Sequence, residues 1–105
     1  MIIRIWHGST RLRDKNSYHE YLNGTGMKDY LSCPGNRGAT LLCRELPDEQ
    51  RAEFLFISYW ESLDAIKEFA GAEIDTAHYY PEDKKFLLGL GPNVTPYEVL
   101  SDSNK

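Results

Sequence analysis

The chain has three histidines, at positions 7, 19 and 78, and two of them are candidates for acid–base chemistry. Imidazole is the side chain whose ordinary pKa suits proton transfer near neutral pH. His7 ends a predicted strand and His78 follows a predicted helix, so both can lie beside a cavity, whereas His19 falls on the solvent side of a helix by periodicity. We therefore predict His7 and His78 as catalytic residues, with a structural role in the rim or core as the alternative.

Aromatic side chains supply a second requirement of a site, a wall that excludes water. The chain contains four Phe, seven Tyr and two Trp, so large rings fill the core, line a pocket, or do both. Tyrosine hydroxyls and the indole N–H can also donate hydrogen bonds to an oxygen that gains negative charge during a reaction. The predicted substrate-binding residues are Ile5, Tyr59, Trp60, Phe69, Tyr79 and Tyr80.

Spacing and charge argue against several other kinds of site. The histidines show no HxH or HxxxH spacing, and Cys33 and Cys43 lie too far apart for a CxxC motif, so we predict no metal site. A formal net charge of −4 and a pI near 5.3 argue against a nucleic-acid partner. No apolar run approaches the ~20 residues of a membrane-spanning helix, and no signal-peptide pattern precedes the first strand. We therefore predict a cytoplasmic protein without a membrane partner.

Two charged positions need separate interpretation. Arg4 lies on a predicted inner strand, where a guanidinium needs a partner: a carboxylate across a dimer interface, or an anionic ligand. Glu82 and Asp83 follow Pro81 and precede two lysines, a pattern typical of a solvated helix start, because acidic side chains stabilise the positive end of a helix.

Hydrophobic patterning and start and stop signals predict the elements that position these residues. Strands are predicted at residues 1–7, 38–46, 53–60 and 94–100, and helices at residues 14–23, 27–32, 63–70 and 81–88. Ser62 is the predicted N-cap of the third helix, and Gly71, in a left-handed conformation, is its predicted stop. Pro96 cannot donate to a sheet ladder, which favours an edge position for the last strand.

The order strand, helix, strand, strand, helix, strand is that of the ferredoxin-like split βαβ plan. We predict an α+β fold with an antiparallel sheet, helices on one of its faces, and the first and third strands in the centre. Residues 1–100 are predicted to form a single domain, and residues 101–105 a flexible tail.

Alternation along the first strand assigns its residues to two sheet faces. We predict that Ile5 and His7 face the helices and close a pocket with Phe69 on its apolar wall and His78 at its polar end. Trp6 and the neighbours on its face are then predicted to lie on the opposite side of the sheet. An exposed apolar face of this size predicts a homodimer that buries it.

Five strings of the sequence resemble those of a known family. They are MIIRIWHGST at the start, PGNRG before the second strand, YWESLDAIKEFAG through the third strand and its helix, and AHYYPEDKKFLL followed by PYEV near the end. Together they are similar to the antibiotic biosynthesis monooxygenase domain of the dimeric α+β barrel superfamily. The resemblance implies a homodimeric barrel with a small-molecule pocket in each subunit. It also implies an oxygenase that acts on a small aromatic or enolisable substrate with no cofactor.

The same superfamily contains haem-degrading oxygenases, which carry an Asn near the end of the first strand, a Trp in the helix after the third strand, and a His further on. This chain has His7 and Phe69 at the first two places and His78 near the third. Haem or tetrapyrrole binding is therefore one alternative function. A non-catalytic dimer that binds a small ligand, or that is purely structural, is the other alternative.

Overall fold

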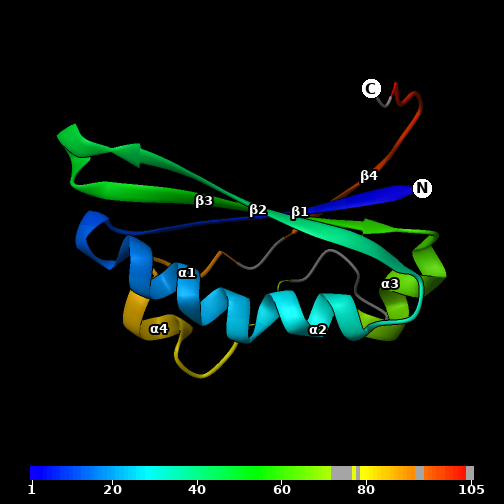
Figure 1. Cartoon of the computed structure of the whole chain (residues 1–105), viewed down its shortest axis with the longest axis horizontal. Helices are drawn as coiled ribbons and strands as arrows, with labels where there is room; N and C mark the ends of the chain where they lie inside the picture. The colour runs from blue at the N-terminus through cyan, green and yellow to red at the C-terminus, as the bar shows by residue number, and fades with distance from the viewer. Residues whose placement is uncertain (72–76, 78, 92–93, 104–105) are drawn as a thin grey trace.

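The computed structural model describes residues 1–71, 77, 79–91 and 94–103 of the chain (Figure 1). The described residues form strands and helices in the predicted order, and the division into a domain of residues 1–100 and a tail stays a prediction. The elements are β1 Ile2–Arg11, α1 Lys15–Gly24, α2 Gly26–Ser32, β2 Asn36–Leu46, β3 Arg51–Trp60, α3 Leu63–Ala70, α4 Asp83–Phe86 and β4 Thr95–Glu98, with short 3-10 turns at Leu12–Asp14 and Pro47–Glu49.

The strands form one antiparallel sheet in the order β2-β3-β1-β4, so the first and third strands are central. Figure 1 shows the helices gathered along one face of this sheet, and the described residues leave its other face uncovered. The predicted α+β class and ferredoxin-like split βαβ plan are therefore confirmed. β4 pairs with β1, with Pro96 opposite Arg4, and lies at the edge of the sheet as its proline predicts.

β3 fills the core with every second side chain. Burial alternates strictly along its ten residues, and the rings of Phe54, Phe56 and Trp60 are buried on the helix side. α1 brings Tyr18 edge-on to Phe54, with 5.3 Å between ring centres. α2 brings Tyr30 edge-on to Phe56, with 5.0 Å between ring centres. Edge-to-face contact is a favoured geometry for aromatic pairs, so these ring contacts stabilise the packing of the helices against the sheet.

The side chains of β1 alternate in the sense opposite to the predicted one. Arg4 and Trp6 are buried against the helices, whereas Ile5 is half-buried and His7 is exposed on the other face. The prediction that Ile5 and His7 face the helices is wrong, and so is the placement of Trp6 on the outer face. The Trp6 indole folds back over the bare backbone at Gly8, where an added Cβ would lie 2.3 Å from the ring.

α3 begins and ends where the sequence predicts. The Ser62 side chain accepts a hydrogen bond from the backbone N–H of Ala65 at 3.2 Å and so caps the helix. Gly71 ends it with a positive φ of 82°, as predicted, but its ψ of −167° lies outside the left-handed helical region, in one that is essentially restricted to glycine. Between these ends, Ile66 is fully buried and Phe69 half-buried.

The errors at the predicted ends of β1 and α4 share one physical reason. β1 continues to Arg11, although the first strand was predicted to end at residue 7, because residues 8–11 stay in register with β3. α4 ends at Phe86 rather than at residue 88, because the chain after it pairs with the extended part of β1. Leu87 forms a bridge with Thr10, and the N–H of residue 88 donates to the carbonyl of residue 9 at 2.9 Å. Pairing between distant segments therefore sets both boundaries.

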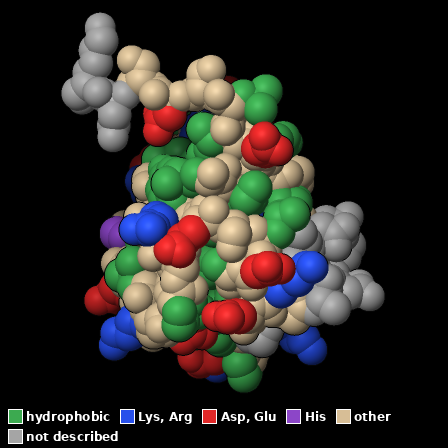
Figure 2. All heavy atoms as spheres, turned by 90° about the vertical axis from the view of Figure 1, so that its right-hand side faces the viewer, with side chains coloured by type: hydrophobic (Ala, Val, Ile, Leu, Met, Phe, Trp, Pro, Cys, Tyr) green, Lys and Arg blue, Asp and Glu red, His purple; other side chains and the backbone are tan. Residues whose placement is uncertain are grey.

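The surface of the described residues carries mixed charge. Figure 2 faces the end of the molecule with the N-terminus and β4, and there acidic and basic side chains are scattered among apolar ones. Basic side chains do not gather into a patch on the described part of this face. No helix of the described residues is long and apolar enough to span a membrane.

Candidate functional site

A cavity lies between the sheet and the helices. It contains about 440 Å³ of empty space including its mouth, and about 30 Å³ of this can take the centre of a water molecule. A space of that size holds one or two waters, so a ring can enter only if the wall side chains shift. The walls are aromatic, and the charged residues among them are Arg4 and Asp83; the rings belong to Trp6, Tyr18, Tyr30, Phe56, Phe69, Tyr79 and Tyr80.

Arg4 lines the cavity and is only 2% exposed. Its guanidinium carbon lies 5.8 Å from the centre of the Phe69 ring, a cation–π contact. Burial raises the pKa of the neighbouring Tyr30, and this effect outweighs the lowering by the Arg4 charge and by hydrogen bonds with Ser58 and Arg4. Tyr30 therefore stays protonated, and its neutral hydroxyl lies beside the buried Arg4 guanidinium.

Asp83 lies at another part of the lining and is 3% exposed, although it begins the short helix α4. Its Oδ1 accepts a hydrogen bond from the Tyr18 hydroxyl at 2.9 Å, and its Oδ2 accepts one from the Tyr80 backbone N–H at 2.6 Å. Burial, followed by the nearby Asp83 charge, strongly raises the pKa of Tyr18, so its hydroxyl keeps its proton and remains a donor. The prediction of a solvated helix start is wrong for Asp83.

Tyr79 and Tyr80 bring the segment before α4 to the cavity as a wall. The Trp6 indole N–H donates to the Tyr79 hydroxyl at 3.3 Å, and that hydroxyl donates to the Gly91 carbonyl. The Tyr80 hydroxyl donates to the Asp29 carboxylate of α2. Burial, and then the hydrogen bond with Asp29, raise the pKa of Tyr80, so this tie to α2 persists at neutral pH.

The structure brings part of the predicted site together. Phe69, Tyr79 and Tyr80 line the cavity, and their role as substrate contacts stays a prediction. Trp60 is fully buried behind this wall, with 5.7 Å between its ring centre and that of Phe69. His78 lies outside the described residues, so its predicted catalytic role also stays a prediction.

Ile5, His7 and Tyr59 lie on the opposite face of the sheet. Ile5 is paired with Ile57 at the middle of the β1–β3 ladder, and the Tyr59 hydroxyl lies 3.3 Å from Thr40 Oγ1 on β2. None of the three predicted residues belongs to the lining of the cavity. Their assignment to the same pocket as Phe69 is therefore corrected, because the register that buries Trp6 turns its odd-numbered neighbours outward.

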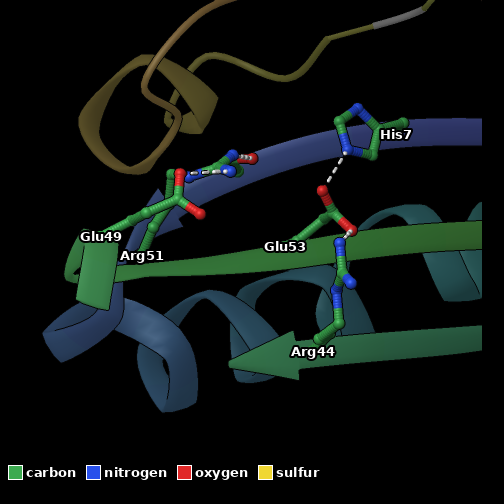
Figure 3. A network of polar contacts seen from close by, with 6 residues as sticks. His7, Arg44, Glu49, Arg51 and Glu53 are labelled. Atoms are coloured by element: carbon green, nitrogen blue, oxygen red, sulfur yellow. Dashed lines mark hydrogen bonds and ion pairs between the residues drawn. The ribbon is translucent and has the colours of Figure 1, made fainter. Parts of the chain in front are cut away.

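His7 belongs to a polar network that crosses three strands (Figure 3). His7 Nε2 lies 3.1 Å from Glu53 Oε2, and Arg44 donates to Glu53 Oε1 at 2.9 Å. The hydrogen bond with His7, followed by that with Arg44, lowers the pKa of Glu53. The side chains of His7 and Arg44 are 55% and 68% exposed, so the network is a solvated feature of the outer sheet face.

Sequence reasoning missed Asp83 and Tyr18 and assigned Arg4 to the outer face. A local signal for Asp83 existed: an Asp three residues after Tyr80 can accept a hydrogen bond from the Tyr80 N–H, and a closed turn of this kind can hold a buried carboxylate. Tyr18 lies one turn before Leu22 on the buried stripe of α1, which places its hydroxyl at the edge of the core. A buried tyrosine hydroxyl needs a hydrogen-bond partner. The sequence alone could not show which carboxylate lies nearest to the Tyr18 hydroxyl in the fold.

No protein-family model matches the sequence, and no curated protein matches it. A solved candidate antibiotic biosynthesis monooxygenase from Bacillus cereus is similar in structure with a TM-score of 0.67, at 17% identity over 99% of this chain and 95% of that chain. The chain has an antibiotic biosynthesis monooxygenase-like fold. MhuD, a haem degrader from Mycobacterium tuberculosis solved with two haems in its active site, gives a TM-score of 0.64 at 18% identity over 99% of this chain and 100% of MhuD. A candidate antibiotic biosynthesis monooxygenase from Nitrosomonas europaea gives 0.61 at 16% identity, over 96% of this chain and 100% of that chain.

The antibiotic biosynthesis monooxygenase-like fold confirms the predicted resemblance at the level of architecture. A fold alone does not define a reaction, so function must be argued from the lining of the cavity. The described residues contain no group of three or more His, Cys, Asp and Glu side chains that could hold a metal ion. The lining of the cavity combines a buried carboxylate, Asp83, with a buried guanidinium, Arg4.

Proposed function

We propose that this chain binds a small aromatic or enolisable molecule in the cavity and oxidises it with O₂ without a bound cofactor. One observation carries the proposal: a buried carboxylate, Asp83, and a buried guanidinium, Arg4, line the same aromatic cavity. Chemistry of this kind requires an apolar space, a base, and a positive group for the anion that the base creates. The lining contains the carboxylate and the guanidinium, and its aromatic side chains would shift to admit the ring.

In the proposed reaction Asp83 is the base. It accepts a proton from a substrate hydroxyl or an activated CH₂ group, while the Tyr18 hydroxyl and the Tyr80 N–H hold the carboxylate in place. Conjugation spreads the resulting negative charge through the substrate ring towards Arg4, which stabilises it. The electron-rich anion then reduces O₂. The CH₂ group becomes a carbonyl, one oxygen atom enters that carbonyl and the other leaves as water, so the substrate supplies all the electrons.

The test is oxygen uptake with a panel of hydroquinones and anthrones. Asp83→Asn keeps the size of the side chain and is expected to lower turnover by about 10²-fold or more. His7→Ala is the matched control, because His7 lies on the outer sheet face, and it is expected to keep full activity. Full activity in Asp83→Asn, with a native circular dichroism spectrum, would refute Asp83 as the base. A comparable loss in His78→Ala alone would assign the base role to His78, as the sequence predicts.

We propose further that two copies of the chain pair through the sheet face opposite the helices. This face is largely apolar along the central strands, with Ile5 opposite Ile57 and further apolar side chains at Ile3, Leu42, Leu55 and Tyr97. Monomers rarely expose apolar patches of this extent, so a second copy is the economical cover. The dimer was predicted from the face of the first strand that carries Trp6, but Trp6 faces the helices. The proposal therefore depends on the apolar residues of the opposite face.

Light scattering tests the dimer. A mass of about twice the 12.1 kDa chain is expected for the native protein. Ile57→Glu places a charge at the centre of the face and is expected to give the single-chain mass. Leu63→Glu, at a 45% exposed position of α3, is the control and is expected to stay dimeric. A native protein with the single-chain mass at micromolar concentration would refute the dimer.

Haem binding is the second candidate function, because MhuD shares the fold and holds haem. One feature counts against it: the described lining of the cavity contains no histidine that could bind iron. The wall side chains would also have to shift further for a tetrapyrrole than for a single ring. A saturable Soret shift on titration with haemin would support haem binding. Absence of the shift in a protein that binds aromatic probes would favour the small-ligand function.

A further inference from the structure

We infer that this chain has a second binding site, for a phosphate monoester, in an open hollow at the end of the sheet where β1 passes into α1. The hollow is lined by Arg11, Leu12, Arg13 and Gln50, and about 340 Å³ of it can take the centres of water molecules. That volume lies at the lower end of the range of roughly 300–1,000 Å³ found for small-molecule pockets. The hollow shares no lining residue with the aromatic cavity, so the inference goes beyond the proposed function.

Two turns of the chain form the hollow, the 3-10 turns Leu12–Asp14 and Pro47–Glu49 with the residues beside them. The N–H of Leu12 donates to the carbonyl of Gln50 at 3.0 Å, and this bond holds the two turns together. The Gln50 side chain is fixed as well, because its Nε2 donates to the Pro47 carbonyl at 2.9 Å. An amide nitrogen has two N–H donors, so one remains for a ligand.

The two arginines of the hollow are available to a ligand. Within the part of the chain that the structure describes, neither the Arg11 nor the Arg13 guanidinium has a hydrogen bond or an ion pair. By contrast, Arg37, Arg44 and Arg51 each donate to a glutamate carboxylate at 2.9–3.0 Å. Arg11 and Arg13 are exposed, and the lining of the hollow contains no carboxylate that could pair with them.

The strand register places a further positive charge beside the hollow. Arg11 lies directly opposite Arg51 in the β1–β3 ladder, and like charges in this position destabilise a sheet. Glu49 accepts a hydrogen bond from Arg51 at 3.0 Å, so the Arg51 charge has a counter-charge and the Arg11 charge has none (Figure 3). Asp14 and Asp48 are close in sequence, but neither belongs to the lining of the hollow. A bound anion would supply the missing negative charge.

A phosphate monoester fits this set of donors. It carries nearly two negative charges at pH 7, which match two guanidinium groups, whereas a carboxylate carries one. Each planar guanidinium can donate two parallel N–H bonds to the oxygens of a phosphate group. The organic part of the ester would lie against Leu12, the apolar side chain of the lining, which is half-buried.

NMR titration of the ¹⁵N-labelled native protein tests the inference. The probes are phenyl phosphate, inorganic phosphate and benzoate, added at equal and low ionic strength because salt screens exposed charges. The backbone amide signals of Arg11, Leu12, Arg13 and Gln50 report binding in the hollow, even if a probe also enters the aromatic cavity. Phenyl phosphate is expected to shift these signals saturably, with a Kd on the order of 1 mM or tighter. Inorganic phosphate is expected to bind more weakly, and benzoate to bind most weakly.

Variants assign the binding to the two arginines. Arg11→Gln and Arg13→Gln are each expected to weaken binding of phenyl phosphate by about fivefold or more, because each removes charge-assisted hydrogen bonds. Arg37→Gln, which removes an exposed arginine that pairs with Glu61, is the matched control and should keep the native affinity. Because Arg11 lies opposite Arg51, the urea midpoint of Arg11→Gln should be no lower than that of the native protein. This measurement separates a binding residue from one that the fold requires.

Three results would contradict the inference. Absence of a saturable shift with phenyl phosphate, or native affinity in both arginine variants, would overturn the site. A clearly lower urea midpoint for Arg11→Gln would overturn the interpretation of Arg11 as a binding residue. Inorganic phosphate that binds as tightly as phenyl phosphate would overturn the monoester as the ligand. None of these measurements depends on oxygen uptake, so failure of the proposed function would leave the inference intact.

Discussion

Tyr18→Phe removes one oxygen atom from the core and tests whether Asp83 is held there as a charged group. The Tyr18 ring packs on Phe54 and Phe86, and phenylalanine keeps these contacts. The lost interaction is the 2.9 Å hydrogen bond to Asp83 Oδ1 between side chains that are 1% and 3% exposed. A hydrogen bond to a charged group contributes about 1.5–3 kcal/mol, so we expect the free energy of unfolding at pH 7 to fall by that amount.

The stability difference between Tyr18→Phe and the native protein also depends on pH, and the raised pKa of Tyr18 sets the direction of this dependence. Burial raises the pKa of Tyr18 in the folded state above the ordinary value of about 10 that holds in the unfolded chain. The stability that this tyrosine contributes is therefore complete below pH 10 and is lost as the pH rises towards the folded-state pKa. Above pH 10 the loss is about 1.4 kcal/mol per pH unit for one such group. The variant lacks the group, so the difference between the two proteins should shrink by about 1.4 kcal/mol between pH 9 and pH 11.

Urea unfolding followed by circular dichroism at pH 7, 9 and 11 measures both effects. Burial also raises the pKa of Tyr30 and Tyr80, so both proteins should lose stability at alkaline pH. The native protein should lose more than the variant, because it also contains the Tyr18 hydroxyl. Ser17→Ala, which removes an exposed hydroxyl from the same helix, is the control and should change the free energy of unfolding by less than about 0.5 kcal/mol. Equal stability of Tyr18→Phe and native protein at pH 7 would refute a stabilising hydrogen bond between Tyr18 and Asp83. A difference that stays constant up to pH 11 would refute the raised pKa.

Three further results are expected. Gly71→Ala should lower the free energy of unfolding by about 1–3 kcal/mol, because φ 82° with ψ −167° is essentially open to glycine alone; an unchanged urea midpoint would show that the end of α3 relaxes freely. Gly8→Ala should cost about 1–3 kcal/mol by displacing the Trp6 indole, which lies 2.3 Å from the new Cβ, and a near-ultraviolet circular dichroism spectrum identical to that of the native protein would contradict this. His7→Ala should raise the pKa of Glu53 towards its ordinary value, since its largest lowering contact is lost; carboxyl-carbon NMR titration measures it, and an unchanged pKa would show that Arg44 suffices.

Much of the fold could be predicted from the sequence because its signals are local. The Ser62 cap, the positive φ at Gly71 and the edge position of the strand with Pro96 each follow from the chemistry of one residue and its close neighbours. The α+β plan follows from the order of such elements. The boundary errors at the ends of β1 and α4 arose where the two segments pair with each other, a contact between positions far apart in the chain.

The candidate site was predicted only in part. Phe69, Tyr79 and Tyr80 line the cavity because aromatic residues on or beside a buried stripe tend to reach the core. His7 was assigned to the cavity because its strand has apolar residues on both faces, so neither face was marked as the inner one. Asp83 was assigned to solvent because acidic residues at a helix start are usually exposed.

The sequence by itself therefore determined which elements form, where α3 begins and ends, and which residues of each strand share a face. Only the tertiary structure decided which face of β1 is covered, because alternation with a period of two is the same in both directions. The Trp6 indole over Gly8 breaks that symmetry, and the choice buries Arg4 while exposing His7. Burial of Asp83 was likewise decided by Tyr18, 65 residues earlier in the chain, because a carboxylate leaves water only where donors from other elements replace its hydration.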